Sequence, residues 1–205
     1  TPLAGLTTQI ELAMRQNDPA NALASLKNPP ASTDRMTRLV SQLLALARNE
    51  PKAEKAMRGD TLDLGALASN ITMEWVPHAL ERQIDLGFEA PSAPVTLFGD
   101  TARLKDLLDN LIDNAVRYTQ PGGQITVSVH TSNGHPLLAV TDNGPGIPRE
   151  QHARVFERFY SVLGHGAEGS GLGLAIVQEI ARMHGGKATI DNGLGGVGTR
   201  VSVMF

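Results

Sequence analysis

The spacing of apolar residues predicts a helical segment at the start of the chain. Apolar side chains recur at helical intervals in two runs before residue 50, namely Leu3, Leu6, Ile10, Leu12 and Met14, then Met36, Leu39, Val40, Leu43, Leu44 and Leu46. Two antiparallel helices are expected, with apolar stripes wide enough to pair with a second copy of the chain. Because Asn28-Pro29-Pro30 cannot continue a regular helix, the second helix should begin near Ser32 or Thr33.

Helices and strands alternate irregularly in the rest of the chain. Helical patterns cover residues 64–82, 101–118, 149–158 and 171–184, and strand patterns cover 84–89, 94–98, 124–131, 136–141, 187–191 and 199–205. We expect Pro77 to kink or divide the first helix and Asp100 to cap the second. This order predicts an α+β fold in which helices cover one face of one sheet.

The chain divides into three predicted segments. Residues 1–50 form the helical hairpin, and residues 62–205 form a larger mixed domain. Residues 51–61 are polar, begin with a proline and contain a glycine near their end, which is typical of a linker.

The amino-acid composition argues against several classes of function. A chain of 205 residues with 41% hydrophobic residues can bury a substantial core. Its net charge of -3, from 18 basic and 21 acidic residues, provides no broad basic surface, so we expect no nucleic-acid partner. The absence of cysteine excludes disulfides, thiolate catalysis and cysteine-based zinc sites, and fits a cytoplasmic location.

One edge of the helix at 101–118 carries candidate ligands. Asn110, Asn114 and Arg117 follow one another at i, i+4 and i+7, on a different face from the apolar stripe. Magnesium prefers oxygen ligands and keeps several waters, so we expect Asn114 to bind Mg²⁺, with Asn110 as a second donor. Arg117 would clamp a phosphate. The alternative is an ordinary solvated helix face.

Two further motifs could bind a nucleotide. Asp142-Asn-Gly-Pro-Gly-Ile-Pro148 follows an apolar strand, and its carboxylate could accept from an exocyclic amine, which favours adenine. An ordinary turn is the alternative. Gly169, Gly171 and Gly173 open a helix whose first N–H groups could face phosphate, or they could simply start that helix. No strand precedes them and no Gly-Lys-Ser/Thr follows, which excludes a dinucleotide fingerprint and a P-loop, and residues 160–168 are typical of a mobile lid.

These blocks, followed by Gly196-Val-Gly-Thr199, resemble the ATP-binding catalytic domain of bacterial sensor histidine kinases, within the wider group that includes gyrase, Hsp90 and MutL. The resemblance covers roughly residues 60–205 and also includes Phe156-Glu-Arg-Phe159-Tyr160. It implies a two-layer α/β sandwich of the Bergerat type, with a mixed sheet covered by helices and a lid before Gly169.

The resemblance also implies roles for individual residues. Asn114 would hold Mg²⁺, Asn110 and Arg117 would meet phosphates, and Tyr118 would stack on adenine. Asp142 would bind the adenine amine with support from Thr199. The remaining ATP-binding positions would be Gly144, Gly146, Ile147, Gly169, Ser170, Gly171, Leu172, Gly173 and Leu174. Ser161 stands where many relatives carry an arginine, so Arg158 and Arg117 are the cations expected to assist catalysis with Asn110.

The implied function is that of a protein histidine kinase in two-component signalling. ATPases of this group place a glutamate at the position of Asn110 to orient water, whereas an amide is a poor base. We therefore expect transfer of the γ-phosphoryl group to a histidine, and from there to the aspartate of a response regulator. A nucleotide-responsive interaction module is an alternative from another class, and a water-using ATPase is a third, disfavoured by Asn110.

The first residues place this chain within a longer protein. Thr1-Pro-Leu resembles the continuation of the family's phosphoacceptor motif, whose histidine would lie four residues before Thr1. The chain is therefore expected to be a truncated cytoplasmic portion of an inner-membrane sensor, unable to phosphorylate itself. It would form a homodimer through its N-terminal helices and meet the membrane only through missing upstream segments.

Overall fold

The computed structural model describes residues 59–162 and 171–205. The helices expected before residue 50 and most of the expected lid lie outside the described residues. Among the helices within them, none is both long and apolar enough to cross a membrane.

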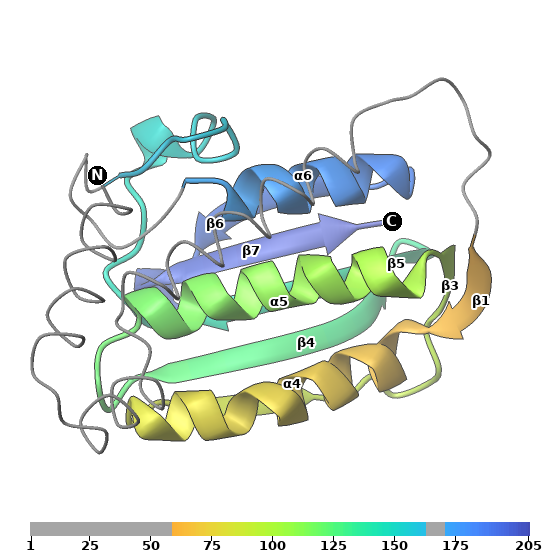
Figure 1. Cartoon of the computed structure of the whole chain (residues 1–205), viewed down its shortest axis with the longest axis horizontal. Coiled ribbons are helices and arrows are strands. Elements are labelled where there is room, and N and C mark those ends of the chain that lie inside the picture. Colours follow the sequence, from red (N-terminus) through yellow and green to blue (C-terminus); the bar gives the residue numbers. More distant parts are fainter. Residues whose placement is uncertain (1–58, 163–170) are drawn as a thin grey trace, which may run out of the picture. The chain divides into compact units, whose positions relative to one another are not determined.

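A five-stranded mixed sheet forms the centre of the described part, with the strand order β2-β4-β5-β7-β6 (Figure 1). The strands are β2 (Asp85–Glu89), β4 (Gln124–Ser132), β5 (His135–Asp142), β6 (Lys187–Asn192) and β7 (Thr199–Met204). β2 runs parallel to β4, and the other neighbours are antiparallel. Ile125 and Val127 are fully buried and Val129 is 2% exposed, which confirms the alternation expected for this strand.

Three helices cover one face of this sheet: α4 (Leu64–Glu81), α5 (Thr101–Tyr118) and α6 (Gly173–Met183) (Figure 1). α5 begins where the sequence predicts, because Asp100 Oδ1 accepts from the N–H groups of Ala102 and Arg103, at 3.0 and 3.2 Å. Its apolar stripe is buried from Leu104 to Val116. The α+β class and the helix-covered mixed sheet are therefore confirmed.

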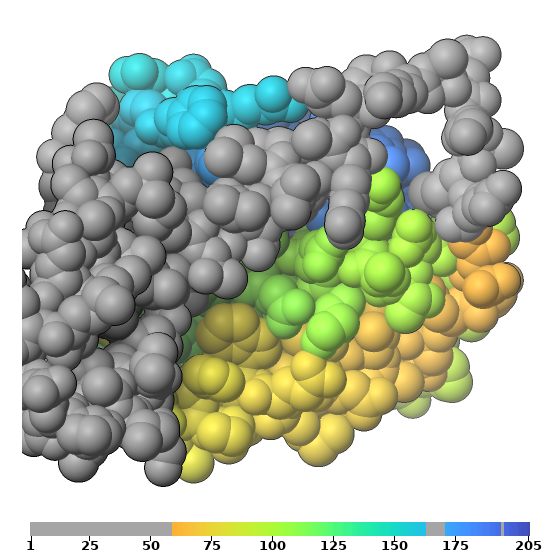
Figure 2. All heavy atoms as spheres, in the orientation of Figure 1, coloured from red at the N-terminus to blue at the C-terminus, as the bar shows by residue number. Residues whose placement is uncertain are grey.

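α4 and α5 lie side by side on the face of the molecule seen in Figure 2. Polar contacts connect these two helices there. Trp75 Nε1 donates to Asp109 Oδ1 at 2.8 Å, and Lys105 pairs with Glu74. α5 is thus held from one side by α4 while its other side meets α6.

Of the two outcomes expected for Pro77, a kink or a division of α4, division does not occur. The helix continues from Leu64 to Glu81 with this proline inside it. Met73, whose carbonyl loses its N–H partner to the proline, and Pro77 itself are both exposed, so water can take the place of the missing donor.

The helix predicted over residues 149–158 is also wrong. The structure has one 3-10 turn, η1 (Arg149–Gln151), followed by irregular turns. Val155 is the buried residue of this stretch, so an apolar stripe that could hold a short helix in place is missing.

A strand that the sequence does not reveal begins within the expected linker. β1 (Asp60–Asp63) pairs antiparallel with β3 (Thr96–Gly99), in the register Asp60 to Gly99. Asp-Thr-Leu-Asp has no alternating apolar pattern, so the partner strand, more than 30 residues away in sequence, defines this element.

Candidate nucleotide site

Asn110 and Asn114 meet the first residue of α6. A Cβ atom added to Gly173 would lie 3.0 Å from Asn114 Nδ2 and 3.4 Å from Asn110 Oδ1. Asn110 Nδ2 donates to the carbonyl of Asp106 at 2.7 Å, so this amide turns its oxygen toward Gly173. The structure therefore brings two predicted polar residues of α5 to the glycine that opens α6.

Asp142 is the last residue of β5 and is fixed by two backbone donors. Its Oδ1 accepts from the N–H of Gly144 at 2.9 Å and from the N–H of Thr199 at 3.2 Å. Within the described part of the chain, no group donates to Oδ2, which remains available to a ligand. The structure thus joins Asp142 to Thr199, the residue expected to support it.

Burial raises the pKa of the Asp142 carboxyl above its ordinary value, although the hydrogen bonds from Gly144 and Thr199 act in the opposite direction. The cost of removing water from the carboxylate therefore exceeds the gain from the two N–H groups. A half-buried acceptor with one unused oxygen is suited to a neutral donor such as an amine.

Close backbone contacts surround Asp142. A Cβ atom at Gly198 would lie 2.0 Å from the Asp142 carbonyl oxygen, and one at Gly193 would lie 2.6 Å from it. Gly198 also has a φ of 76°, in the left-handed region that favours glycine. Neither glycine was among the predicted site residues. Their glycine-rich turn was visible in the sequence, but the carbonyl that they approach was not.

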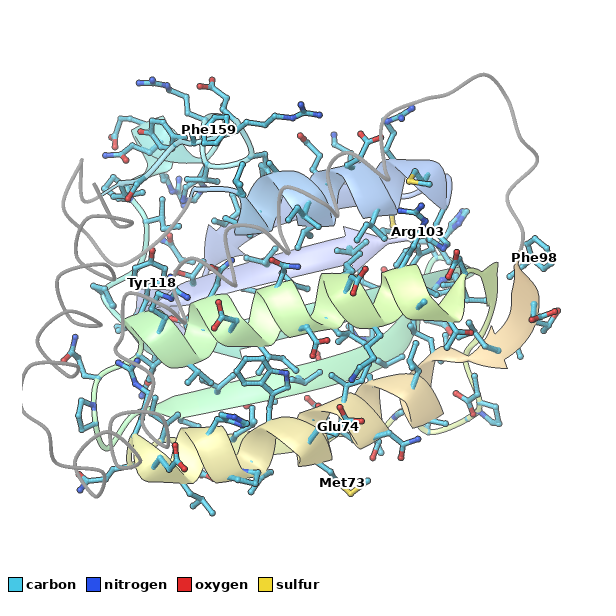
Figure 3. All side chains as sticks on the ribbon, in the orientation of Figure 1. Met73, Glu74, Phe98, Arg103, Tyr118 and Phe159 are labelled. Atoms are coloured by element: carbon cyan, nitrogen blue, oxygen red, sulfur yellow. The ribbon has the colours of Figure 1, made fainter. Side chains whose placement is uncertain are left out.

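Tyr118 lies at the end of α5, next to the turn that follows Asp142 (Figure 3). A Cβ atom at Gly144 would lie 3.0 Å from the Tyr118 carbonyl oxygen and 3.0 Å from Asp142 Oδ1. Gly146, with a φ of 74°, approaches the carbonyl of Gly198 in the same way. Tyr118, Asp142, Gly144 and Gly146 therefore belong to one cluster, and the half-buried Ile147 follows them.

The two predicted cations are placed differently. Arg117 pairs with Asp113 through Nη2 and Oδ2 at 2.9 Å, and the side chains are 13% and 18% exposed. This partner was not predicted, and a phosphate would have to compete with it or share the guanidinium. Arg158 is exposed, and within the described residues no hydrogen bond or ion pair links it to another predicted site residue.

A backbone hydrogen bond connects the residues on either side of the expected lid. The N–H of Phe159 donates to the carbonyl of Gly171 at 2.8 Å, and both residues have a positive φ, 64° and 67°. Phe159 is 65% exposed and points outward (Figure 3). Gly169 and Ser170 lie outside the described residues. Leu172 is fully buried and Leu174 half-buried.

Comparison with known proteins identifies this arrangement. Residues 99–205 match the family described as "Histidine kinase-, DNA gyrase B-, and HSP90-like ATPase". Sensor protein kinase PmrB of Pseudomonas aeruginosa is 36% identical over 206 residues, which cover 100% of this chain and 43% of PmrB. This chain therefore spans less than half the length of that relative.

Two solved structures are similar to it in fold and sequence. The mycobacterial sensor histidine kinase MprB superposes with a TM-score of 0.61 and 28% identity, over 72% of this chain and 97% of that one. Full-length ShkA in complex with AMPPNP gives a TM-score of 0.72 and 30% identity, over 84% of this chain and 36% of that one. The chain belongs to the family of histidine kinase-, DNA gyrase B- and HSP90-like ATPases, and it carries the ATP-binding domain found in sensor histidine kinases.

Proposed function

We propose that this chain is the ATP-binding catalytic region of a sensor histidine kinase. It transfers the γ-phosphoryl group of ATP to a histidine of the full-length protein, for relay to an aspartate of a response regulator. The observation that carries the proposal is the convergence of two amides of α5 on the first residue of α6, in a domain that also holds a half-buried carboxylate at the end of β5. The first group suits a phosphate chain and its metal, and the second suits adenine.

The residues present fit a magnesium–nucleotide complex. Within the described residues, no three His, Cys, Asp or Glu side chains gather to hold a metal. The side-chain oxygens that lie beside Gly173 are those of the two amides, Asn110 and Asn114. Asn114 would hold Mg²⁺, which would neutralise phosphate charge while the phosphates supply further oxygen ligands. The N–H groups at the start of α6 would face the phosphates. Gly173 lets the two amides of α5 approach this end of α6 closely.

Asn110 favours phosphoryl transfer to histidine over hydrolysis. Its Nδ2 is held by the Asp106 carbonyl, and its oxygen is an amide oxygen that cannot act as an effective base toward water. A neutral imidazole nitrogen needs no such base. It forms the N–P bond while the bond from the γ-phosphorus to the bridging oxygen breaks, ADP leaves with the electron pair, and the ring releases its other proton to solvent. The protein contributes alignment and charge neutralisation.

The remaining proposals concern the full-length protein. PmrB and its relatives are sensor kinases, and this chain covers 43% of PmrB. We propose that residues 1–50 form the dimerisation helices and that the protein is an inner-membrane sensor with this region in the cytoplasm. AMPPNP bound to ShkA supports the use of ATP by this chain as well.

A complementation assay tests the proposed function. A longer version of the protein, which bears the expected phosphoacceptor histidine and Asn114→Ala in its own site, is mixed with this chain and γ-labelled ATP. Label on the longer protein is expected. It should disappear when this chain also carries Asn114→Ala and persist with Asn70→Ala, which changes an exposed asparagine of α4.

Two other outcomes would contradict a kinase. Release of free phosphate without labelled protein would identify a water-using ATPase. Binding of AMPPNP with neither product would identify a nucleotide-responsive interaction module.

A further inference from the structure

His184 connects two helices through both nitrogens of its ring. It follows the last residue of α6 and is 9% exposed, the buried histidine among the described residues. Its Nδ1 lies 2.8 Å from the carbonyl of Ile180, and the backbone N–H of Asp100 donates to its Nε2 at 3.1 Å. Because a carbonyl can only accept, Nδ1 carries the proton and Nε2 is the acceptor, which defines a neutral ring.

The donor to His184 belongs to the residue that starts α5. Asp100 caps this helix with its side chain and uses its own N–H for the imidazole. Arg103, in the first turn of α5, lies beside the last turn of α6, and Tyr118 lies at the opposite end of α5 (Figure 3). The last turn of α6 is therefore tied to the first residues of α5.

The opposite end of α6 meets the predicted metal ligand. α6 has 11 residues and runs antiparallel to α5, so its first residue, Gly173, lies beside Asn110 and Asn114. At 1.5 Å per residue the two ends of α6 are about 16 Å apart. The position of Gly173 relative to Asn114 thus depends on how α6 is held at its far end, where His184 makes a polar contact with Asp100.

The imidazole is tightly enclosed. A Cβ atom at Gly99 would lie 2.7 Å from His184 Cδ2 and 2.9 Å from Nε2, and the Phe205 ring packs edge-on at a centroid distance of 6.2 Å. Because the ring is packed closely on these two sides, it holds the Asp100 N–H at a defined place.

We propose that His184 is a positioning residue for the phosphate end of the nucleotide site. It fixes α6 along α5, and thereby fixes the N–H groups at the start of α6 relative to Asn114. The adenine end depends on Asp142 and Thr199, which lie on β5 and β7. Loss of the His184 contact should therefore weaken binding of the phosphate chain and leave binding of the base unchanged. This inference rests on the proposed ATP-binding function.

The test compares two ligands in three variants of this chain. Calorimetry gives the dissociation constants of Mg-AMPPNP and of adenosine, at a temperature where circular dichroism shows each variant to be folded. His184→Phe keeps an aromatic ring without its acceptor and should lose about tenfold in AMPPNP affinity, the value of one hydrogen bond, with unchanged adenosine affinity. His184→Gln, which can both accept and donate, should recover part of the loss. His130→Phe, at an exposed position of β4, is the matched control and should bind as the wild type does.

Several results would overturn the inference. If His184→Phe only lowers the melting temperature, or weakens both ligands equally, His184 is a packing residue. If the wild type binds neither ligand, the proposed function itself fails, and the inference with it.

A measurement on the wild-type protein tests the inference even if His184→Phe does not fold. The Asp100 amide resonance should shift when AMPPNP is added and stay unchanged with adenosine. A resonance indifferent to both ligands would contradict the coupling.

Discussion

The two ends of the proposed site contain side chains of different charge. Asp142 is a half-buried carboxylate whose desolvation outweighs its two backbone donors. Asn114 is a half-buried amide that carries no charge and whose contribution depends on the direction of its oxygen. Substitution at the first position should therefore change the pH dependence of binding, whereas substitution at the second should change its metal dependence.

Asn114→Ala should abolish the contribution of Mg²⁺ to AMPPNP binding. A polar group that contacts a charged partner contributes about 1.5–3 kcal/mol to binding. A loss of about 100-fold in AMPPNP affinity is therefore expected when magnesium is present. Calorimetry with magnesium and with a chelator measures it. Asn70→Ala should keep the magnesium response. Equal affinities for wild type and Asn114→Ala would remove Asn114 from the site.

Asp142→Asn should weaken the preference for adenine over guanine and remove an acid transition in binding. The raised pKa means that the wild-type carboxylate is neutralised at a higher pH than an ordinary aspartate. Adenine affinity should accordingly begin to fall in mildly acidic solution. Protonation of the adenine ligand itself lowers its affinity for wild type and Asp142→Asn alike, so the difference between the two proteins reports on Asp142. A parallel decline in both would contradict the assignment.

The same shift makes a stability prediction of definite sign. Between the ordinary pKa and the raised one, the folded protein binds more protons than the unfolded chain, so the free energy of unfolding decreases as pH rises through this window. The melting temperature of Asp142→Asn relative to wild type should therefore be higher at pH 7 than at pH 4. A difference that does not change with pH would show that burial does not destabilise the ionised form.

The antiparallel pair α5 and α6 is the element that shapes the phosphate end of the site. Both helices lie on one face of the sheet, and they touch where Gly173 faces Asn110 and Asn114. The position requires a residue without a side chain because the two amides occupy the space, and its φ is not positive. Here glycine serves close approach and not backbone conformation.

Gly173→Ala should separate stability from binding. Alanine has the higher helix propensity, so the free energy of unfolding should stay level or rise by less than about 1 kcal/mol. The new Cβ would lie 3.0 Å from Asn114 Nδ2 and would displace this side chain, which should lower Mg-AMPPNP affinity about tenfold, as for one lost hydrogen bond. Chemical denaturation and calorimetry measure the two effects.

Gly87→Ala in β2 is the control for this substitution. Nothing lies within 4 Å of an added Cβ at that position, so nucleotide affinity should not change. Full affinity of Gly173→Ala would show that the amides do not approach the ligand from this side of α6.

The whole domain assembles its site from segments far apart in the chain. Asp142 meets Thr199 across the antiparallel pair of β5 and β7, and Asn114 meets Gly173 across the pair of helices. His184 and Asp100 hold those helices at the other end of α6. A domain of this kind needs its sheet to bring the adenine end together and its helix layer to bring the phosphate end together.

Local patterns in the sequence predicted the elements and motifs that depend on neighbouring residues. The cap at Asp100, the apolar stripe of α5, the alternation in β4 and the position of Asp142 at a strand end all follow from periods of a few residues and from side-chain chemistry. The order of the glycine-rich blocks indicated the family that the comparisons then identified.

Features that arise from contacts between distant segments were decided by folding in three dimensions. β1 needs β3 as its partner, Gly198 is required by the carbonyl of Asp142, and Arg117 is engaged by Asp113. His184 bonds to a residue 84 positions earlier in the chain. Periodicity reports which face of an element is apolar, but the identity of the atoms that meet that face depends on how the sheet and helices pack, and that information is not local.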